Sequence, residues 1–315
     1  MKKALTFFVA CVCLLLLFSC RSDPGGSSQG NEDGRICITF VVDGKKEEKI
    51  FSKNEKIVYP TVAEKENYVF RGWFYDKELN VPAYLGTSFS SDVTLYAGYS
   101  FDAASALNKI YSNQIKASVE VLVEHKKNLF SQVSTQKVTG SGVIFDEDES
   151  CYYVLTNAHV IVEKDGYSRT VSVTDCYGAK HSAVVIKALD EYDLALLKIA
   201  KTEKALYVIR FAEEAAKLGD TVISVGSPGG IDNAVTVGEI KKYDVTPESI
   251  REGKLSFAVI WHDSKIDHGS SGGMLLNAQL ELVGINYAVG TSTDDSEFVC
   301  GFAVDAEKIN EFLEK

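Results

Sequence analysis

The sequence predicts an all-β protein in which a small β-rich domain precedes a larger β domain, folded as a sandwich or a pair of barrels. The main observation is a series of about twelve short strand-like segments after residue 117, separated by Gly, Asp, Ser and Asn. The second is a shorter β-rich and aromatic stretch at residues 35–99. The third is the length of 315 residues, 45% of them hydrophobic, which suffices for two domains with a core each.

The N-terminus has the pattern of an export signal. A short basic start, MKK, precedes the apolar run ALTFFVACVCLLLLFS, which is shorter than a membrane-spanning helix needs. Ser19 directly before Cys20 resembles the lipobox of bacterial lipoproteins. The resemblance implies that residues 1–20 are a lipoprotein signal peptide, that Cys20 is lipidated, and that the exported protein is anchored to a membrane of the bacterial cell envelope, on a periplasmic or surface face. The alternative is an ordinary signal peptide with an incidental cysteine.

Residues 21–34, RSDPGGSSQGNEDG, contain almost nothing to bury and predict a flexible tether. The small domain follows at residues 35–99. The run RICITFVV alternates and leads into Asp-Gly, a hairpin-turn signal, and later aromatic runs supply bulky side chains for a small core. The stretches ITFVVDGK, YVFRGWFYDKE and DVTLYAGY resemble a single internalin B-repeat of bacterial surface proteins, with Tyr99 where the family usually has Trp. A spacer is the simplest role, and ligand binding is the alternative.

Two helices flank the larger domain. Residues 100–116 predict a helical linker that is capped by Asp102. Its apolar residues at helical spacing are Ala104, Leu107, Ile110 and Tyr111. At the C-terminus, DAEKINEFLEK predicts a helix packed on the outside of the larger domain. The side chains on its apolar side are Ala306, Ile309, Phe312 and Leu313.

Composition argues against several classes of function. The net charge of −11 disfavours nucleic acid as the main partner, because phosphate would be repelled. No zinc-like CxxC pair is present, so we expect neither a metal nor another cofactor. Apart from the signal and Cys20, four cysteines remain, which allow three disulfide pairings or four free thiols. They are Cys37, Cys151, Cys176 and Cys300.

Three short motifs supply the groups that acyl transfer needs. His159 follows a strand-like segment in VLTNAHVI, and an imidazole can accept a serine proton near neutral pH. Asp193 directly precedes LALLKI, where a carboxylate drawn into the interior needs a donor such as an imidazole N–H. Ser271 lies in GSSGG at residues 269–273, where glycines permit a sharp turn with inward-pointing amides. Each motif alone also fits a structural role, but together they favour a nucleophile with its base.

These motifs, with GSGVIF and GDTVISVGSPGG, resemble the HtrA/Deg branch of trypsin-like serine proteases over residues 117–315. The resemblance implies a chymotrypsin-like double β-barrel protease domain with the catalytic residues His159, Asp193 and Ser271. It also implies an oxyanion hole made by the amides of Gly269 and Ser271, supported by that of Ser270. It further implies protein or peptide substrates and a homotrimer.

Two departures from the branch are visible. Ser270 replaces Asn and Met274 replaces Pro in the usual G-N-S-G-G-P turn, which could alter the rigidity of the oxyanion loop. Most members also carry PDZ domains after the protease, whereas this sequence ends at Lys315, so we expect no regulation through such domains.

Substrate selectivity follows from positions that the resemblance assigns. Ile266 and Val289 would line the pocket for the residue before the scissile bond, which favours small or medium aliphatic side chains. Lys265 stands where a preference for Arg or Lys would need an acidic residue. His262 and His268 also lie close to Ser271 in the sequence, but strand–turn geometry would direct them elsewhere.

The leading hypothesis is an exported, lipid-anchored serine endopeptidase that acts through an acyl-enzyme, with a role in envelope protein quality control. The first alternative is a peptide-binding or adhesive surface protein with an inactive or latent protease fold. The intact His, Asp and Ser argue against it, because binding needs none of them. An esterase is the second alternative, and the absence of a G-x-S-x-G elbow between strand and helix argues against that.

Overall fold

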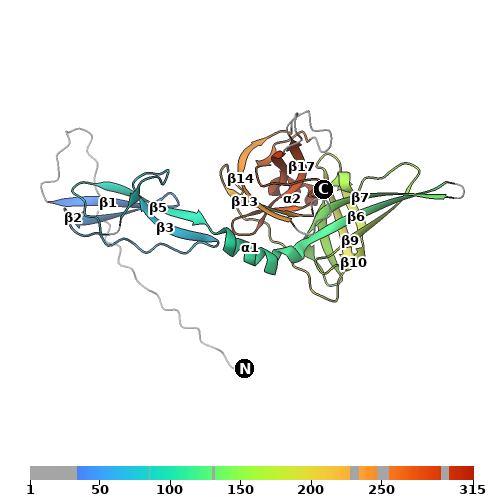
Figure 1. Ribbon diagram of the computed structural model, residues 1–315, viewed down its shortest axis with the longest axis horizontal. Coiled ribbons are helices and arrows are strands. Elements are labelled where there is room, and N and C mark those ends of the chain that lie inside the picture. Colours follow the sequence, from blue (N-terminus) through green and yellow to red (C-terminus); the bar gives the residue numbers. More distant parts are fainter. Residues whose placement is uncertain (1–33, 85, 130–131, 228–233, 247–254, 292–297) are drawn as a thin grey trace, which may run out of the picture.

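The computed structural model describes residues 34–84, 86–129, 132–227, 234–246, 255–291 and 298–315. The predicted signal peptide, Cys20 and nearly all of the tether lie outside these residues. Figure 1 shows a small β domain joined through a short helix to a larger β body, from which one long hairpin projects. Within the described residues, no helix is long and apolar enough to cross a membrane.

The small domain is one five-stranded sheet with the order β2-β1-β5-β3-β4. Its strands are β1 (Arg35–Val42), β2 (Lys45–Ser52), β3 (Tyr68–Phe74), β4 (Pro82–Ala83) and β5 (Val93–Phe101). The predicted Asp-Gly turn joins β1 to β2, with Asp43 at φ 50° and Gly44 at φ 75°, the left-handed pair that such hairpins require. Alternate β1 residues are buried against Trp73 and Leu95, so aliphatic and aromatic side chains share the small core. Several aromatic residues predicted to supply this core are exposed instead, because a single sheet has a second face toward solvent: Phe70, Tyr75 and Tyr84.

The helical linker forms, and of the four residues at the predicted helical spacing only Ile110 is fully buried. Helix α1 (Ala103–Ser112) is capped by Asp102, whose carboxylate accepts from the Ser105 N–H at 3.0 Å. The residues that it buries in the core of the larger domain are Ala106 and Ile110, whereas Tyr111 is 58% exposed. Ala106 and Ile110 are four residues apart, so they lie on the same face of α1 and make this contact together. The predicted domain boundary at residue 99 also falls inside β5, which continues to Phe101.

The first half of the larger domain is an open seven-stranded sheet, preceded by the short helix η1 (Gln114–Ala117). Its order is β10-β9-β6-β7-β8-β12-β11. The elements are β6 (Ser118–Leu129), β7 (Gln132–Glu147), β8 (Cys151–Thr156), η2 (Ala158–Val160), β9 (Ser168–Thr174), β10 (Lys180–Ser182), β11 (Val184–Leu189) and β12 (Leu194–Ala200). Strand β6 pairs along its whole length with residues 132–143 of β7, and the two strands make the projecting hairpin (Figure 1).

The second half is a closed barrel of the order β13-β14-β15-β18-β17-β16. Its elements are β13 (Thr221–Gly226), β14 (Ala234–Asp244), β15 (Val259–His262), β16 (Met274–Asn277), β17 (Leu282–Thr291) and β18 (Phe298–Asp305), followed by α2 (Ala306–Glu314). Asp305 caps α2, which buries Ile309 and Phe312 as predicted. One apolar cluster contains residues from both halves and from both α-helices. The closed barrel beside the open, half-barrel sheet, followed by a C-terminal helix, matches the predicted chymotrypsin-like architecture.

All four described cysteines are free thiols, and each is half-buried. The sequence left open whether these cysteines form disulfides or stay free, and this structure has four free thiols.

Candidate active site

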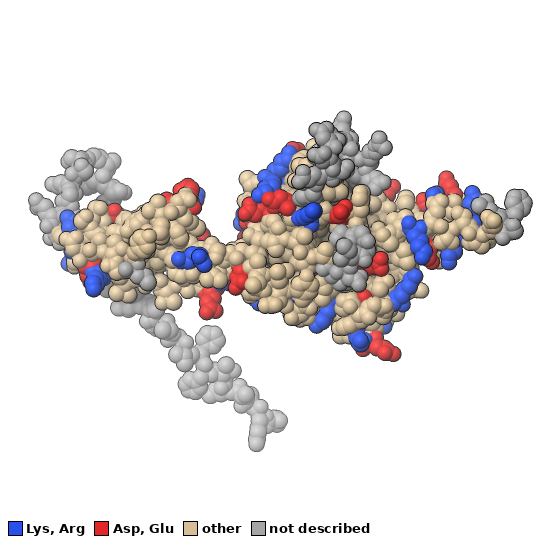
Figure 2. Space-filling model, in the orientation of Figure 1, with Lys and Arg blue, Asp and Glu red and all other residues tan. Residues whose placement is uncertain are grey.

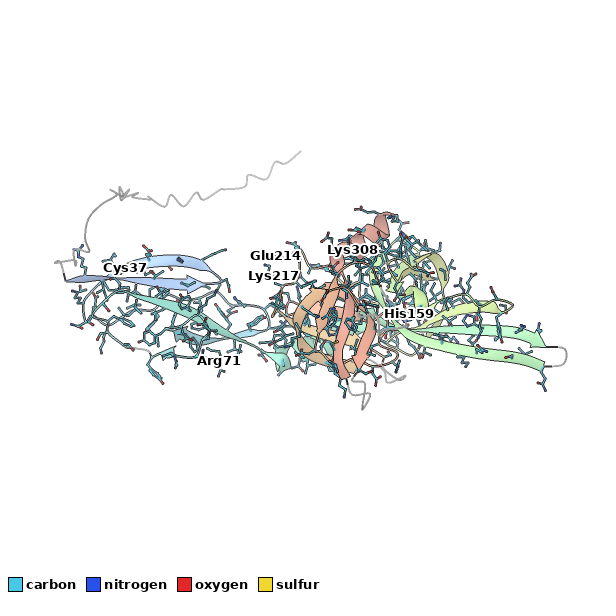
Figure 3. The ribbon with its side chains drawn as sticks, turned by 90° about the horizontal axis from the view of Figure 1, so that it is seen from above. Cys37, Arg71, His159, Glu214, Lys217 and Lys308 are labelled. Carbon is cyan, nitrogen blue, oxygen red and sulfur yellow. The ribbon has the colours of Figure 1, made fainter. Side chains whose placement is uncertain are left out.

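The base and the orienting carboxylate come from the ends of two neighbouring strands. His159 lies in η2, directly after β8, and Asp193 lies directly before β12. Because β8 and β12 pair antiparallel, with Thr156 opposite Ala195, the two segments meet. His159 Nδ1 is 2.8 Å from Asp193 Oδ2, and the His159 backbone N–H donates to Asp193 Oδ1 at 3.0 Å. Figure 3 shows His159 near the place where the long hairpin leaves the body.

The Asp193 carboxylate is buried, whereas the imidazole remains partly open. The Asp193 side chain is 6% exposed and that of His159 is 25% exposed. A buried carboxylate needs donors, and the two His159 N–H groups supply them. Nδ1 of His159 is thus held against the buried carboxylate, and the exposed part of the imidazole is left to exchange a proton with a substrate or a nucleophile.

The turn that presents Asp193 is backbone-strained and is held by an asparagine. Asp193 has φ 50°, a left-handed conformation that is unusual for a residue with a Cβ. Its carbonyl oxygen accepts from Asn157 Nδ2 at 2.9 Å and from the Ala158 N–H at 3.2 Å. Asn157 belongs to the motif VLTNAHVI, but the sequence does not predict its role, because only the tertiary contact with Asp193 reveals it.

The predicted nucleophile lies on a turn between β15 and β16 that two strands hold. Ser271 Oγ donates to the Tyr287 carbonyl on β17 at 3.3 Å. The Ser271 carbonyl accepts from the Ser141 N–H on β7 at 2.7 Å, and Ser141 Oγ donates to the Gly269 carbonyl at 2.7 Å. Ser141 therefore links the sheet of the first half to the turn of the second. Sequence reasoning missed this residue, because nothing in GSGVIF assigns it to a partner.

Glycines bring the Ser271 turn close to the segment of His159. A Cβ atom built on Gly140 would lie 2.7 Å from Val160 Cγ2 and 3.1 Å from the Ser271 carbonyl oxygen, so both segments contact this one residue. Gly272 has φ 86°, and a Cβ there would overlap the Ser141 carbonyl oxygen and Thr156 Oγ1. Only glycine permits both the left-handed turn and this close approach.

The backbone amides of the turn separate into free and engaged groups. Among the described residues, the N–H groups of Gly269 and Ser271 donate no hydrogen bond. The Ser270 N–H donates to the Asp267 carbonyl at 2.9 Å. The expectation that the Ser270 amide supports an oxyanion hole is therefore wrong, because this donor closes the turn. Gly269 and Ser271 keep the two donors that an oxyanion would need.

The two residues predicted to line the substrate pocket flank one glycine. Val289 on β17 pairs with Gly301 on β18 and is half-buried. Ile266 is 7% exposed, and its Cδ1 would lie 2.9 Å from a Cβ built on Gly301. Lys265 is exposed. Ile266 and Val289 thus meet at Gly301, which also contacts the His262 imidazole.

The two other histidines near Ser271 in the sequence are directed elsewhere, as predicted. His262 is fully buried and contacts Asn286 and Ser264, and His268 is exposed. Within the part of the chain that the structure describes, no group of three His, Cys, Asp or Glu side chains could hold a metal ion.

Comparison with known families divides the chain in the same way as the structure. The family model described as "Trypsin-like peptidase domain" matches residues 140–285. The model described as "Listeria-Bacteroides repeat domain" matches residues 37–98, the small domain.

Several curated proteins resemble the larger domain. A probable periplasmic serine endoprotease, DegP-like, of Buchnera aphidicola subsp. Baizongia pistaciae is 36% identical over 172 residues, which are 54% of this chain and 35% of that protein. The serine protease Do-like HtrA of Bacillus subtilis (strain 168) is 34% identical over 189 residues, 59% of this chain and 40% of that protein. This chain thus spans well under half the length of these relatives.

Among solved structures, an HtrA-type protease, AlgW, with a tripeptide matches with a TM-score of 0.52 and 25% identity, over 66% of this chain and 62% of that one. The fold, the three motifs in chain order and these likenesses agree. Residues 140–285 thus match the trypsin-like peptidase model and residues 37–98 match the Listeria-Bacteroides repeat model, and the larger domain is similar to HtrA-type serine proteases.

Proposed function

We propose that this protein is a serine endopeptidase that cleaves protein substrates through an acyl-enzyme. The observation that supports the proposal is the His159–Asp193 pair, at 2.8 Å with a buried carboxylate. The segments of His159 and Ser271 both contact Gly140, and the N–H groups of Gly269 and Ser271 donate to no described residue. A binding module would need neither the buried His159–Asp193 hydrogen bond nor the backbone donors at Gly269 and Ser271. The names of the relatives, which are serine proteases, support the same activity.

The mechanism assigns one task to each group. Ser271 Oγ attacks the scissile carbonyl while His159 accepts its proton, and Asp193 keeps the imidazole in the required tautomer and stabilises its charge. The amides of Gly269 and Ser271 donate to the developing oxyanion. His159 then gives the proton to the leaving amine, and water, activated by the same imidazole, hydrolyses the acyl-enzyme.

Three finer features belong to this proposal. The apolar side chains of Ile266 and Val289 favour a small or medium aliphatic side chain before the scissile bond. The lipobox-like Ser19–Cys20 would anchor the protein to an envelope membrane, where it would act in protein quality control. A trimer is the assembly that the family resemblance implies. Metabolic labelling with a fatty acid, with Cys20→Ala as the control, tests the anchor, and sedimentation equilibrium tests the trimer.

The role of the carboxylate is tested by hydrolysis of casein with Asp193→Asn. An amide stabilises the wrong tautomer of His159, so we expect kcat to fall by about 10⁴-fold. Asp190→Asn is the matched control, because Asp190 lies in the same turn but is exposed, and it should keep wild-type activity. Equal activity of wild type and Asp193→Asn in folded protein would remove the assignment.

A further inference from the structure

A chain of polar side chains runs through the closed barrel behind the Ser271 turn. His262 at the end of β15 has its Nδ1 2.7 Å from Ser264 Oγ and its Nε2 3.0 Å from Asn286 Oδ1. Ser264 Oγ is in turn 2.7 Å from Ser224 Oγ on β13. All four residues are at most 3% exposed. So many buried polar groups are unfavourable unless each is paired, and here each is.

The partners give the chain a direction. Asn286 Nδ2 donates to the Met274 carbonyl at 3.3 Å, which turns the amide oxygen toward His262. His262 Nε2 therefore carries the proton and donates to Asn286, and Nδ1 accepts from the Ser264 hydroxyl. Ser264 is left to accept from Ser224. Burial lowers the pKa of His262 to about 4, so the ring is neutral at neutral pH, as this assignment requires.

The backbone makes room for the ring. A Cβ on Gly301 would overlap the His262 imidazole, and a Cβ on Gly238 would overlap the Ser264 backbone nitrogen. The hydrogen-bonded side chains are therefore closely packed inside the barrel. Any larger residue at Gly301 or Gly238 would displace them.

Asn286 joins this chain to the proposed nucleophile. Its carbonyl accepts from the Gly272 N–H at 2.8 Å, and its N–H donates to the Gly273 carbonyl at 2.9 Å. The next residue, Tyr287, accepts from Ser271 Oγ through its carbonyl. The β17–β18 register shifts between Asn286 and Ala288, so Tyr287 lies at a bulge directly after Asn286, which still pairs with Ala303.

We propose that the chain Ser224–Ser264–His262–Asn286 positions the Ser271 turn, and that His262 is a positioning residue of the protease. By holding the Asn286 side chain, His262 holds the backbone that pairs with Gly272 and Gly273. It thereby aligns Ser271 Oγ and the free amides with the substrate carbonyl. This inference rests on the proposed function, because it assigns a role in that same reaction.

The kinetic test compares three variants of the full chain. His262→Leu fills similar space but offers neither donor nor acceptor, whereas His262→Gln keeps one of each. Ile260→Ala is the control for stability alone, because Ile260 packs in the barrel on the same strand without joining the chain. Fluorophosphonate inactivation then separates kinact from KI for each folded variant.

With His262→Leu we expect kinact to fall about 10–100-fold while KI stays within about threefold. We expect His262→Gln to stay within about threefold of wild type in both constants. Ile260→Ala should lower the melting temperature yet keep kinact. Wild-type kinact in folded His262→Leu, or equal losses in His262→Leu and Ile260→Ala, would overturn the proposal.

A second readout does not depend on activity. Histidine NMR of the wild type should show the Nε2-protonated tautomer at His262. Exchange of the Gly272 amide should accelerate by about tenfold or more in His262→Leu, but not in Ile260→Ala. If fluorophosphonate does not label the wild type, the proposed function fails while Gly272 exchange still decides the positioning role. An Nδ1-protonated ring, or unchanged Gly272 protection, would contradict it.

Discussion

At the scale of single residues, the site depends on what its glycines leave out. The turn of Ser271 approaches β7 and β8 so closely that a side chain at Gly272 has no space. The same residue has a positive φ, so strain and overlap act together. Gly272 thus determines where Ser271 lies, although Gly272 itself contributes no reacting atom.

Gly272→Ala should therefore abolish casein hydrolysis and destabilise the fold by several kcal/mol, since both effects apply. Gly178→Ala separates them, because Gly178 has φ 80° but open space where a Cβ would lie. That control should cost only about 1 kcal/mol, from backbone strain, and keep activity. Chemical denaturation and initial rates measure the two quantities. Equal free energies of unfolding for the two variants would show that the close approach is unimportant.

At the scale of elements, strand pairing assembles groups that are distant in the sequence. The pairing of β8 with β12 joins His159 to Asp193, and the pairing of β17 with the turn supports Ser271. The barrel around His262 adds a polar chain inside an otherwise apolar interior. This interior has a consequence for stability at low pH.

The free energy of unfolding should fall between about pH 6.5 and pH 4 because of His262. Burial lowers its folded-state pKa to about 4, against 6.5 for the free imidazole. As the pH falls, the unfolded chain therefore binds a proton at His262 before the folded chain does. The stability that neutral His262 contributes is fully present above about pH 6.5 and is lost as the pH falls to about 4. The loss is on the order of 3 kcal/mol. Urea unfolding over this range should show a smaller decline for His262→Gln, and an identical decline would exclude His262 as its source.

The features that depend on local sequence patterns could be predicted from the sequence. Alternation and turn residues located the strands, and spaced motifs identified His159, Asp193 and Ser271 as residues that could meet. The burial of Ala106 beside Ile110 in α1 could not be predicted, because apolar spacing does not reveal which turn of a helix meets another domain. The polar chain of His262 was also beyond sequence reasoning, since its members are joined only by barrel closure.

At the scale of the whole molecule, the two domains meet across a narrow neck (Figure 2). Asn67 is 4% exposed, and its Nδ2 donates to the Ala278 carbonyl of the barrel at 2.8 Å. Lys109 on α1 pairs with Glu66 at 3.0 Å. A cavity of about 470 Å³ lies beside these contacts, between the small domain and the barrel. In the part of the chain that the structure describes, these polar contacts hold the small domain against α1 and the barrel.

Asn67→Gly should broaden the distribution of distances between the domains, because it removes the Asn67–Ala278 bond without straining its φ of 58°. Asn54→Gly is the matched control, since Asn54 has φ 62° but is exposed within the small domain. Small-angle X-ray scattering of both variants measures the change. Indistinguishable scattering from the two would mean that this bond does not restrain the domains.

The most direct test of the central claim is the site at which the full, folded chain forms a covalent adduct with a fluorophosphonate. We expect mass spectrometry of digested protein to locate one adduct on Ser271, formed much more slowly in His159→Ala and not at all in Ser271→Ala. Labelling that is the same in Ser271→Ala, or a folded wild type that takes up no probe on Ser271, would contradict the assignment of this chain as a serine endopeptidase.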